Sequence, residues 1–66
     1  MDAYRFYLLD SRNLIASVEV IDCSSDIEAR RRADTLLVQR PEFRGIEVWQ
    51  MERRVYVIIV GVDAAE

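Results

Sequence analysis

An apolar run near the end of the chain, residues 55–62 (VYVIIVGV), most constrains the fold. The run is too short to cross a membrane as a helix, and its β-branched residues favour a strand. A strand with one face in water alternates apolar and polar residues. This run does not alternate, so we expect both of its faces to be covered. A chain of 66 residues with one predicted helix can supply one cover, so the other points to a second copy or another protein.

The length allows one domain, assigned to residues 1–66, and at this size a core alone rarely supplies more than roughly 3–5 kcal/mol of net stability. Hydrophobic residues make up 52% of the chain and charged residues 32%, which is typical of a folded soluble domain rather than of a disordered tail. Cys23 is the only cysteine, so a disulfide could form only between two chains. Self-association is therefore the expected source of added stability.

The charge balance argues against two functional classes. The formal net charge is −3, and the chain contains no histidine. A mildly acidic domain lacks the positive field that drives non-specific nucleic-acid binding, and it lacks the commonest general base and metal ligand. No catalytic constellation, nucleotide loop or metal signature stands out, so we expect no enzyme activity and no cofactor. The first residues lack the features of a secretory signal, so we expect a cytoplasmic protein with no membrane association.

Two strands are predicted in the first third of the chain, at residues 4–9 and 14–21. Between them, Asp10 can start a turn, and Asn13 can adopt the left-handed conformation that closes a hairpin with a bulge. Asp10 then lies opposite Leu14. Counting back from this pair gives a core face of Tyr4, Phe6, Leu8, Ala16, Val18 and Val20. The opposite face then carries Arg5, Tyr7, Leu9, Ile15, Ser17, Glu19 and Ile21.

A helix is predicted to begin after Ser25, the N-cap, with Glu28 completing a capping box three residues later. An apolar stripe follows at positions that share one helix face: Ala29, Ala33, Leu36 and Leu37. Pro41 ends the helix about two residues earlier. In the connection that follows, we expect Phe43 to fill the seam between helix and sheet and Gly45 to permit a sharp turn.

A second hairpin is predicted from residues 46–49 and 54–60, joined by a turn at residues 50–53. If Trp49 lies opposite Arg54, the side chains facing the helix are Ile46, Val48, Val55, Val57 and Ile59. The far side then carries Glu47, Trp49, Tyr56, Ile58 and Val60.

Together the elements predict an α+β fold of the order ββαββ: a four-stranded, mainly antiparallel sheet with one helix packed on one face. We expect the strand order 2-1-3-4. A right-handed crossover from the second strand to a parallel third strand can straddle the first strand in this order.

This arrangement resembles a group of small, uncharacterised proteins of alphaproteobacteria. The residues that carry the resemblance are Tyr4-Arg5-Phe6-Tyr7, Leu9-Asp10, Asp26-Ile27-Glu28-Ala29, Ala33, Leu36 and Glu47-Val48-Trp49. In that group the second turn often contains Asp-Gly, where this chain has Gln50-Met51. The resemblance implies a domain of unknown function with the ββαββ order, and it supplies no activity.

On the side without a helix, the predicted sheet presents a partly apolar surface that could exceed the few hundred Å² a monomer usually exposes. The predicted interaction residues are Tyr7, Leu9, Ile15, Trp49, Tyr56, Ile58 and Val60, with Ile21 beside them. We expect a homodimer, with another protein as an alternative partner. Two copies could pack face to face through this surface, or edge to edge through residues 58–62.

A single-stranded nucleic-acid binder is the alternative from a different class. The same surface offers aromatic rings for stacking, with arginines beside them: Tyr7, Trp49, Tyr56, Arg5 and Arg54. The negative net charge and two glutamates on the same predicted face argue against nucleic acid.

Three further readings concern the start of the helix. Cys23 precedes it, where the helix dipole can lower a thiol pKa, so Cys23 could act as a redox switch. The simpler interpretation is a small apolar residue in the corner between strand and helix. The acids Asp22, Asp26 and Glu28 could bind a hard cation, although helix capping explains them more simply. The opening at residues 25–29 also fits an antitoxin-like partner protein, although it is a common way to cap a helix.

Overall fold

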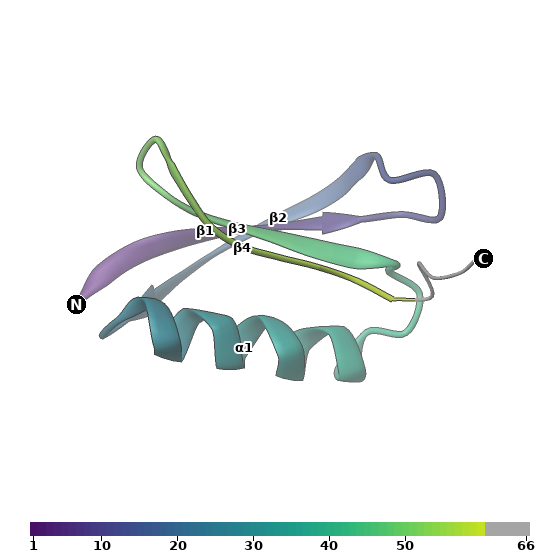
Figure 1. Cartoon of the computed structure of the whole chain (residues 1–66). Helices are drawn as coiled ribbons and strands as arrows, with labels where there is room; N and C mark the ends of the chain where they lie inside the picture. The colour runs from purple at the N-terminus through teal and green to yellow at the C-terminus, as the bar shows by residue number, and fades with distance from the viewer. Residues whose placement is uncertain (61–66) are drawn as a thin grey trace.

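The computed structural model describes residues 1–60, which form a four-stranded sheet with one helix on one side (Figure 1). The strands are β1 (Asp2–Leu9), β2 (Ile15–Cys23), β3 (Gly45–Gln50) and β4 (Arg53–Ile59), and the helix is α1 (Asp26–Gln39). The strand order is β2-β1-β3-β4, and each neighbouring pair is antiparallel. The predicted α+β fold, the ββαββ order and the strand order are confirmed.

The core lies between the helix and the sheet. Its buried residues are Tyr4, Phe6, Leu8, Cys23, Ala29, Ala33, Leu37, Ile46 and Val48. Six more side chains pack partly against it: Ile21, Leu36, Phe43, Val55, Tyr56 and Ile58. Ala29 and Ala33 have no exposed surface, and their small size lets the helix lie close to the sheet. Burying a large side chain such as Phe6 contributes about 1.5–3 kcal/mol.

The helix begins at the predicted cap. The Ser25 hydroxyl accepts the Glu28 backbone N–H at 3.2 Å. The Glu28 carboxylate does not return to the N-cap, as a standard capping box would require. It accepts the backbone N–H and the hydroxyl of Ser24, each at 2.6 Å, and these hydrogen bonds lower the Glu28 pKa.

The first hairpin closes as predicted, but a bulge reverses the predicted faces of β2. Asn13 has a positive φ of 65°, and Leu9 pairs with Ile15. One step further, Leu8 pairs with Ser17, which leaves Ala16 as the extra residue. The predicted core positions on β2 are therefore wrong: Ala16, Val18 and Val20 are exposed. The residues turned toward the helix are Ser17, Glu19, Ile21 and Cys23.

The second hairpin repeats this pattern. Trp49 lies opposite Arg54, as predicted, but Val48 lies opposite Tyr56, and Val55 is the extra residue. A bulge sets two residues against one on the neighbouring strand, so every later side chain changes face. The residues of β4 that pack against the core are Val55, Tyr56 and Ile58. The predicted far-side positions of Tyr56 and Ile58 are therefore wrong, and Val57 and Ile59 take the far side.

Gly45 also differs from its predicted role. It is the first residue of β3, not part of a sharp turn. A Cβ atom at this position would lie 2.7 Å from the Ile58 carbonyl oxygen, closer than atoms of neighbouring strands can pack. The position therefore requires glycine because β4 passes so close to it.

Candidate interaction surface

The sheet face away from the helix, called the helix-free face below, is a grid of three rows across β2, β1, β3 and β4. The Arg5 row contains Val20, Arg5, Trp49 and Arg54. The Tyr7 row contains Val18, Tyr7, Glu47 and Val57. The Leu9 row contains Ile15, Leu9, Gly45 and Ile59. The charges of the grid lie in its first two rows, and one more charge, Asp22, lies beyond the Arg5 row, where it pairs with Ala3 on the same face.

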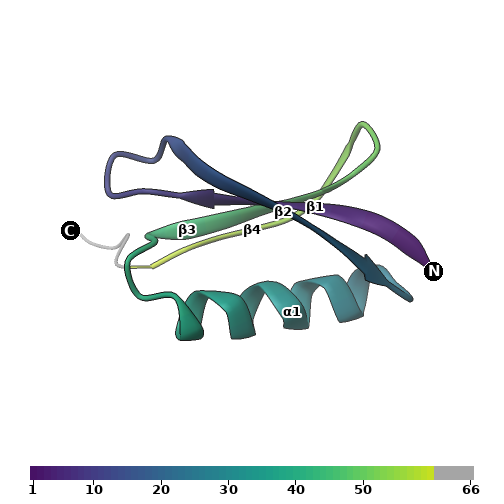
Figure 2. The ribbon, with the colours of Figure 1, turned by 180° about the vertical axis from the view of Figure 1, so that it is seen from behind.

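Apolar side chains dominate this face. The helix lies on the other side of the sheet, and no segment within residues 1–60 crosses over this face (Figure 2). On the edge strand β2, Ile15 is 59% exposed and Val20 is 64% exposed. Two more valines are exposed, Val18 and Val57. Tyr7, Trp49 and Ile59 are half-buried. Contiguous apolar surface of this kind marks an interaction site more often than a free surface.

A shallow hollow of about 420 Å³ lies on this face, lined by Arg5, Tyr7, Ile15, Glu47, Trp49, Met51 and Glu52. The Arg5 guanidinium lies 5.8 Å from the centre of the Tyr7 ring and donates a hydrogen bond to the Met51 carbonyl. The Trp49 indole N–H donates to Glu47 Oε1 at 3.0 Å. These contacts hold both aromatic rings in place beside the charged groups.

The charges on this face have both signs and form no ion pair within residues 1–60. Arg5 and Arg54 share one row, and Glu47 lies in the next. The ion pairs of the described residues lie elsewhere: Arg40 with Glu19 and Glu42, and Arg53 with Asp26. While Glu47 Oε1 accepts the indole N–H, its Oε2 makes no hydrogen bond within residues 1–60. A mixture of this kind favours a partner that also carries both signs.

The predicted interaction residues divide between the two faces. On the helix-free face lie Tyr7, Ile15, Trp49 and Leu9, although Leu9 is only 3% exposed. Val60 follows β4 and is exposed, but it lines a hollow with Leu37 and Phe43 on the helix side, so its predicted far-side position is wrong. The rest of the predicted pairing edge, residues 61 and 62, lies outside the described residues.

Tyr56 belongs to the helix side. Its hydroxyl donates to Asp34 Oδ1 at 3.0 Å, and the Arg30 guanidinium lies 5.0 Å from the centre of its ring. Burial and the hydrogen bond to Asp34 raise the Tyr56 pKa. The ring is thereby tied to the helix and removed from the predicted stacking surface.

Sequence reasoning missed four members of the helix-free face: Val18, Val20, Val57 and Ile59. All four lie beyond a bulge. The extra residues of the two bulges are Ala16 and Val55, and neither alanine nor valine is a residue type that indicates a bulge. Glu19 gave no sign of the error in the sequence, because an open face is an ordinary place for a glutamate. Its predicted place was the open face, yet it lies opposite Phe6 and forms an ion pair with Arg40 at 3.0 Å.

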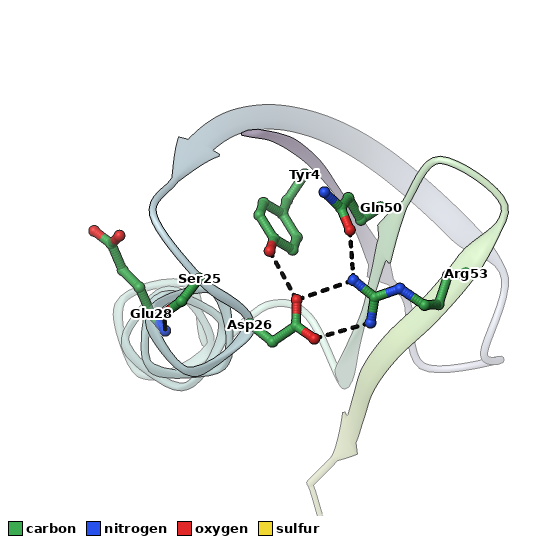
Figure 3. A network of polar contacts seen from close by, with 6 residues as sticks. All are labelled: Tyr4, Ser25, Asp26, Glu28, Gln50 and Arg53. Atoms are coloured by element: carbon green, nitrogen blue, oxygen red, sulfur yellow. Dashed lines mark hydrogen bonds and ion pairs between the residues drawn. The ribbon is translucent and has the colours of Figure 1, made fainter. Parts of the chain in front are cut away.

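A polar network joins the start of the helix to the sheet (Figure 3). Asp26, the first residue of α1, accepts the Tyr4 hydroxyl at 2.7 Å. Arg53, the first residue of β4, donates to both Asp26 oxygens at 2.8 and 3.1 Å and also to Gln50. Arg53 and Tyr4 lower the Asp26 pKa to about 2, and the Asp26 carboxylate raises the Tyr4 pKa to about 12. The network therefore holds structure together and leaves Asp26 charged.

The other candidate groups have structural surroundings. Cys23 has no exposed surface, and burial, followed by the Glu28 carboxylate, raises its thiol pKa, which works against a redox role. Of the three acids considered for a cation, Asp26 and Glu28 are engaged in the contacts above. Within residues 1–60, no group of three or more potential ligands could hold a metal ion. The single described helix is not long and apolar enough to cross a membrane.

Comparison with known proteins supplies no relative: no family model, curated protein or solved structure matches this chain. The resemblance to the alphaproteobacterial group stays a prediction.

Proposed function

We propose that this protein is a small, non-enzymatic interaction module of the cytoplasm that forms a homodimer through its helix-free face. The observation that carries the proposal is the apolar grid, which has no cover within residues 1–60. A domain of this size has a small core, and burying a second apolar face adds stability that the monomer lacks.

The orientation of β2 supports this function. Its more apolar side, with Val18 and Val20, faces away from the helix, whereas Glu19 takes an inward position and pairs with Arg40. A strand that only served the monomer core would be expected to turn the valines inward. A partner on the helix-free face gives both sides of β2 a surface to pack against.

Sedimentation velocity over a wide concentration range, with reductant present, tests the proposal. We expect the unmodified protein to form a dimer. Val18→Glu places a charge on the helix-free face and should shift the protein to monomer at the same concentration. Val38→Glu is the matched control because Val38 is 82% exposed on the helix, so it should leave the dimer intact. Circular dichroism of both variants verifies that they fold.

Two results would contradict the proposal. One is a monomer at every concentration. The other is a dimer that Val18→Glu leaves as strong as Val38→Glu does, which would place the contact elsewhere. A monomer that retains a different protein from cell extract would favour the alternative of a heterologous partner, including the antitoxin-like reading.

A nucleic-acid role keeps one supporting observation, the grouping of Arg5, Tyr7 and Trp49 in one hollow. Two observations weaken the nucleic-acid role. Tyr56 lies on the helix side, and the negatively charged Glu47 lines the same hollow. Trp49 is the only tryptophan, so its fluorescence reports directly on this site. Quenching by a mixed-sequence oligonucleotide at low salt, reversed by added salt, would favour this function over self-association.

A further inference from the structure

We propose that the two copies pack face to face about a two-fold axis that runs parallel to the strands, between β1 and β3. Arg5 of each copy then faces the partner's Trp49, and Tyr7 faces the partner's Glu47. This inference rests on the proposed homodimer and specifies its geometry.

A homodimer with one shared surface has a two-fold axis, and two orientations keep the strands of the stacked sheets aligned. An axis parallel to the strands sets β1 against the partner's β3 and β2 against the partner's β4, and each row meets the same row. An axis perpendicular to the strands and through the Tyr7 row sets every strand against its own copy, and the Arg5 row meets the Leu9 row. Both orientations suit twisted sheets, so shape alone does not separate them.

The parallel axis gives complementary neighbours to Arg5 and Tyr7 on the inner strands, and it sets Arg54, on the edge strand β4, against the partner's Val20. Arg5 meets an indole ring, which attracts a guanidinium through its π face. The Tyr7 hydroxyl meets the partner's Glu47, whose Oε2 has no hydrogen bond within residues 1–60. The donor and the free acceptor therefore match without rearranging the existing bond from Trp49.

The same axis also matches the apolar positions. Val18 on β2 meets the partner's Val57 on β4, and Ile15 meets the partner's Ile59. These four positions are exposed or half-buried in the single chain, so their contact removes apolar surface from water. No two like charges face one another in any of the three rows.

The perpendicular axis fails on charge. It places Glu47 directly against the partner's Glu47 at the centre of an apolar contact, where two like charges repel strongly. It also places Arg5 against the partner's Leu9, so the guanidinium loses water without gaining a hydrogen-bond acceptor or a ring. The charge pattern of the grid therefore favours the parallel axis over a perpendicular axis through the Tyr7 row.

Crosslinking between two cysteine variants tests the geometry. Val18→Cys and Val57→Cys are prepared separately, mixed, and treated with a short bis-maleimide reagent. Stacked sheets lie about 10 Å apart, so the reagent can join facing positions. With the parallel axis, position 18 faces position 57, and the two copies of position 18 are offset by three strand spacings, about 14 Å, in addition to the sheet separation. We expect a mixed 18–57 product and little 18–18 product.

The native thiol does not confuse the result, because Cys23 has no exposed surface and the unmodified protein should give no crosslink. A predominant 18–18 product from a sedimenting dimer would overturn the geometry and leave the homodimer standing. A monomer in sedimentation would overturn both proposals together. A dimer that gives neither product would also overturn this geometry, because the two β-strand positions would then not lie in the contact.

A second variant separates the two axes by affinity. Glu47→Gln removes a carboxylate that the parallel axis sets against a hydroxyl donor, so the dimer should weaken several-fold. With the perpendicular axis the same change would relieve repulsion and strengthen the dimer. Dilution followed by Trp49 fluorescence measures the dissociation constant, and a stronger dimer would overturn the proposal.

Discussion

The Arg53 guanidinium donates two hydrogen bonds to the Asp26 carboxylate, at 2.8 and 3.1 Å, and thereby joins the start of β4 to the first turn of the helix. A two-pronged contact of this kind fixes orientation as well as distance. Tyr4 adds a third bond to the same carboxylate from β1, at 2.7 Å. Three elements distant in sequence therefore meet at one ionised group.

The first prediction concerns acid. The Asp26 pKa falls from its ordinary value of 3.8 to about 2, mainly because of Arg53. A pKa depressed by folding means that the carboxylate stabilises the fold fully above about pH 4 and loses this contribution as the pH falls toward 2. Asp26→Asn should lower stability at neutral pH and flatten the pH dependence in that window. Urea unfolding followed by Trp49 fluorescence measures both effects.

Asp22→Asn is the matched control, because Asp22 is exposed and forms no ion pair within residues 1–60. This variant should unfold with the same pH dependence as the unmodified protein. An unchanged acid transition in Asp26→Asn would show that the network contributes nothing to the acid transition.

The second prediction concerns alkali. Tyr4 has a pKa of about 12, raised from 10.0 chiefly by its hydrogen bond to Asp26. A raised pKa means that this bond stabilises the fold fully below pH 10 and is lost as the pH rises toward 12. Tyr4→Phe keeps the buried ring, lowers stability at neutral pH, and should weaken the alkaline loss. Unfolding free energies at several alkaline pH values test this, and an unchanged alkaline loss in Tyr4→Phe would contradict the prediction.

The local features of the fold could be predicted from the sequence because they depend on neighbouring residues. Asn13 adopts its left-handed turn, Ser25 caps the helix, and Trp49 lies opposite Arg54. The faces of the outer strands could not be predicted, because one extra residue in a ladder reverses every side chain beyond it. Ala16 and Val55 are ordinary strand residues, and their bulges follow from packing across the whole sheet.

The same reversal decided how much of the candidate surface could be predicted. On the inner strands β1 and β3, Tyr7 and Trp49 were placed on the correct face, because no bulge precedes them in the count. On the outer strands, the prediction placed Ile21 and Tyr56 on the helix-free face, where the structure has Val20 and Val57. The sequence predicted that an apolar surface exists, and the bulges determine which side chains form it.

The third prediction concerns the turn between β3 and β4. Met51 has a positive φ of 56°, a conformation that costs a side-chain-bearing residue about 1–2 kcal/mol. Its side chain is exposed, so little packing would be lost by removing it. Met51→Gly should therefore stabilise the protein by about 1 kcal/mol in urea unfolding, even after the entropy cost of glycine. Glu52→Gly, at a position without positive φ, should destabilise it by about 0.5–1 kcal/mol. Equal effects of the two changes would contradict this account of the turn.

The fourth prediction concerns the close approach of β4 to Gly45. A Cβ at this position would meet the Ile58 carbonyl oxygen at 2.7 Å and the Ile59 Cα at 3.3 Å, and both atoms belong to the backbone. Relief requires the two strands to separate, so Gly45→Ala should destabilise the protein by about 1–3 kcal/mol in urea unfolding. The Ile59 side chain lies at 3.0 Å from the same point, but shortening it leaves the backbone clash in place. Adding Ile59→Ala to Gly45→Ala should therefore bring no recovery, and a recovery would show that the side chain, not the strand backbone, requires glycine here.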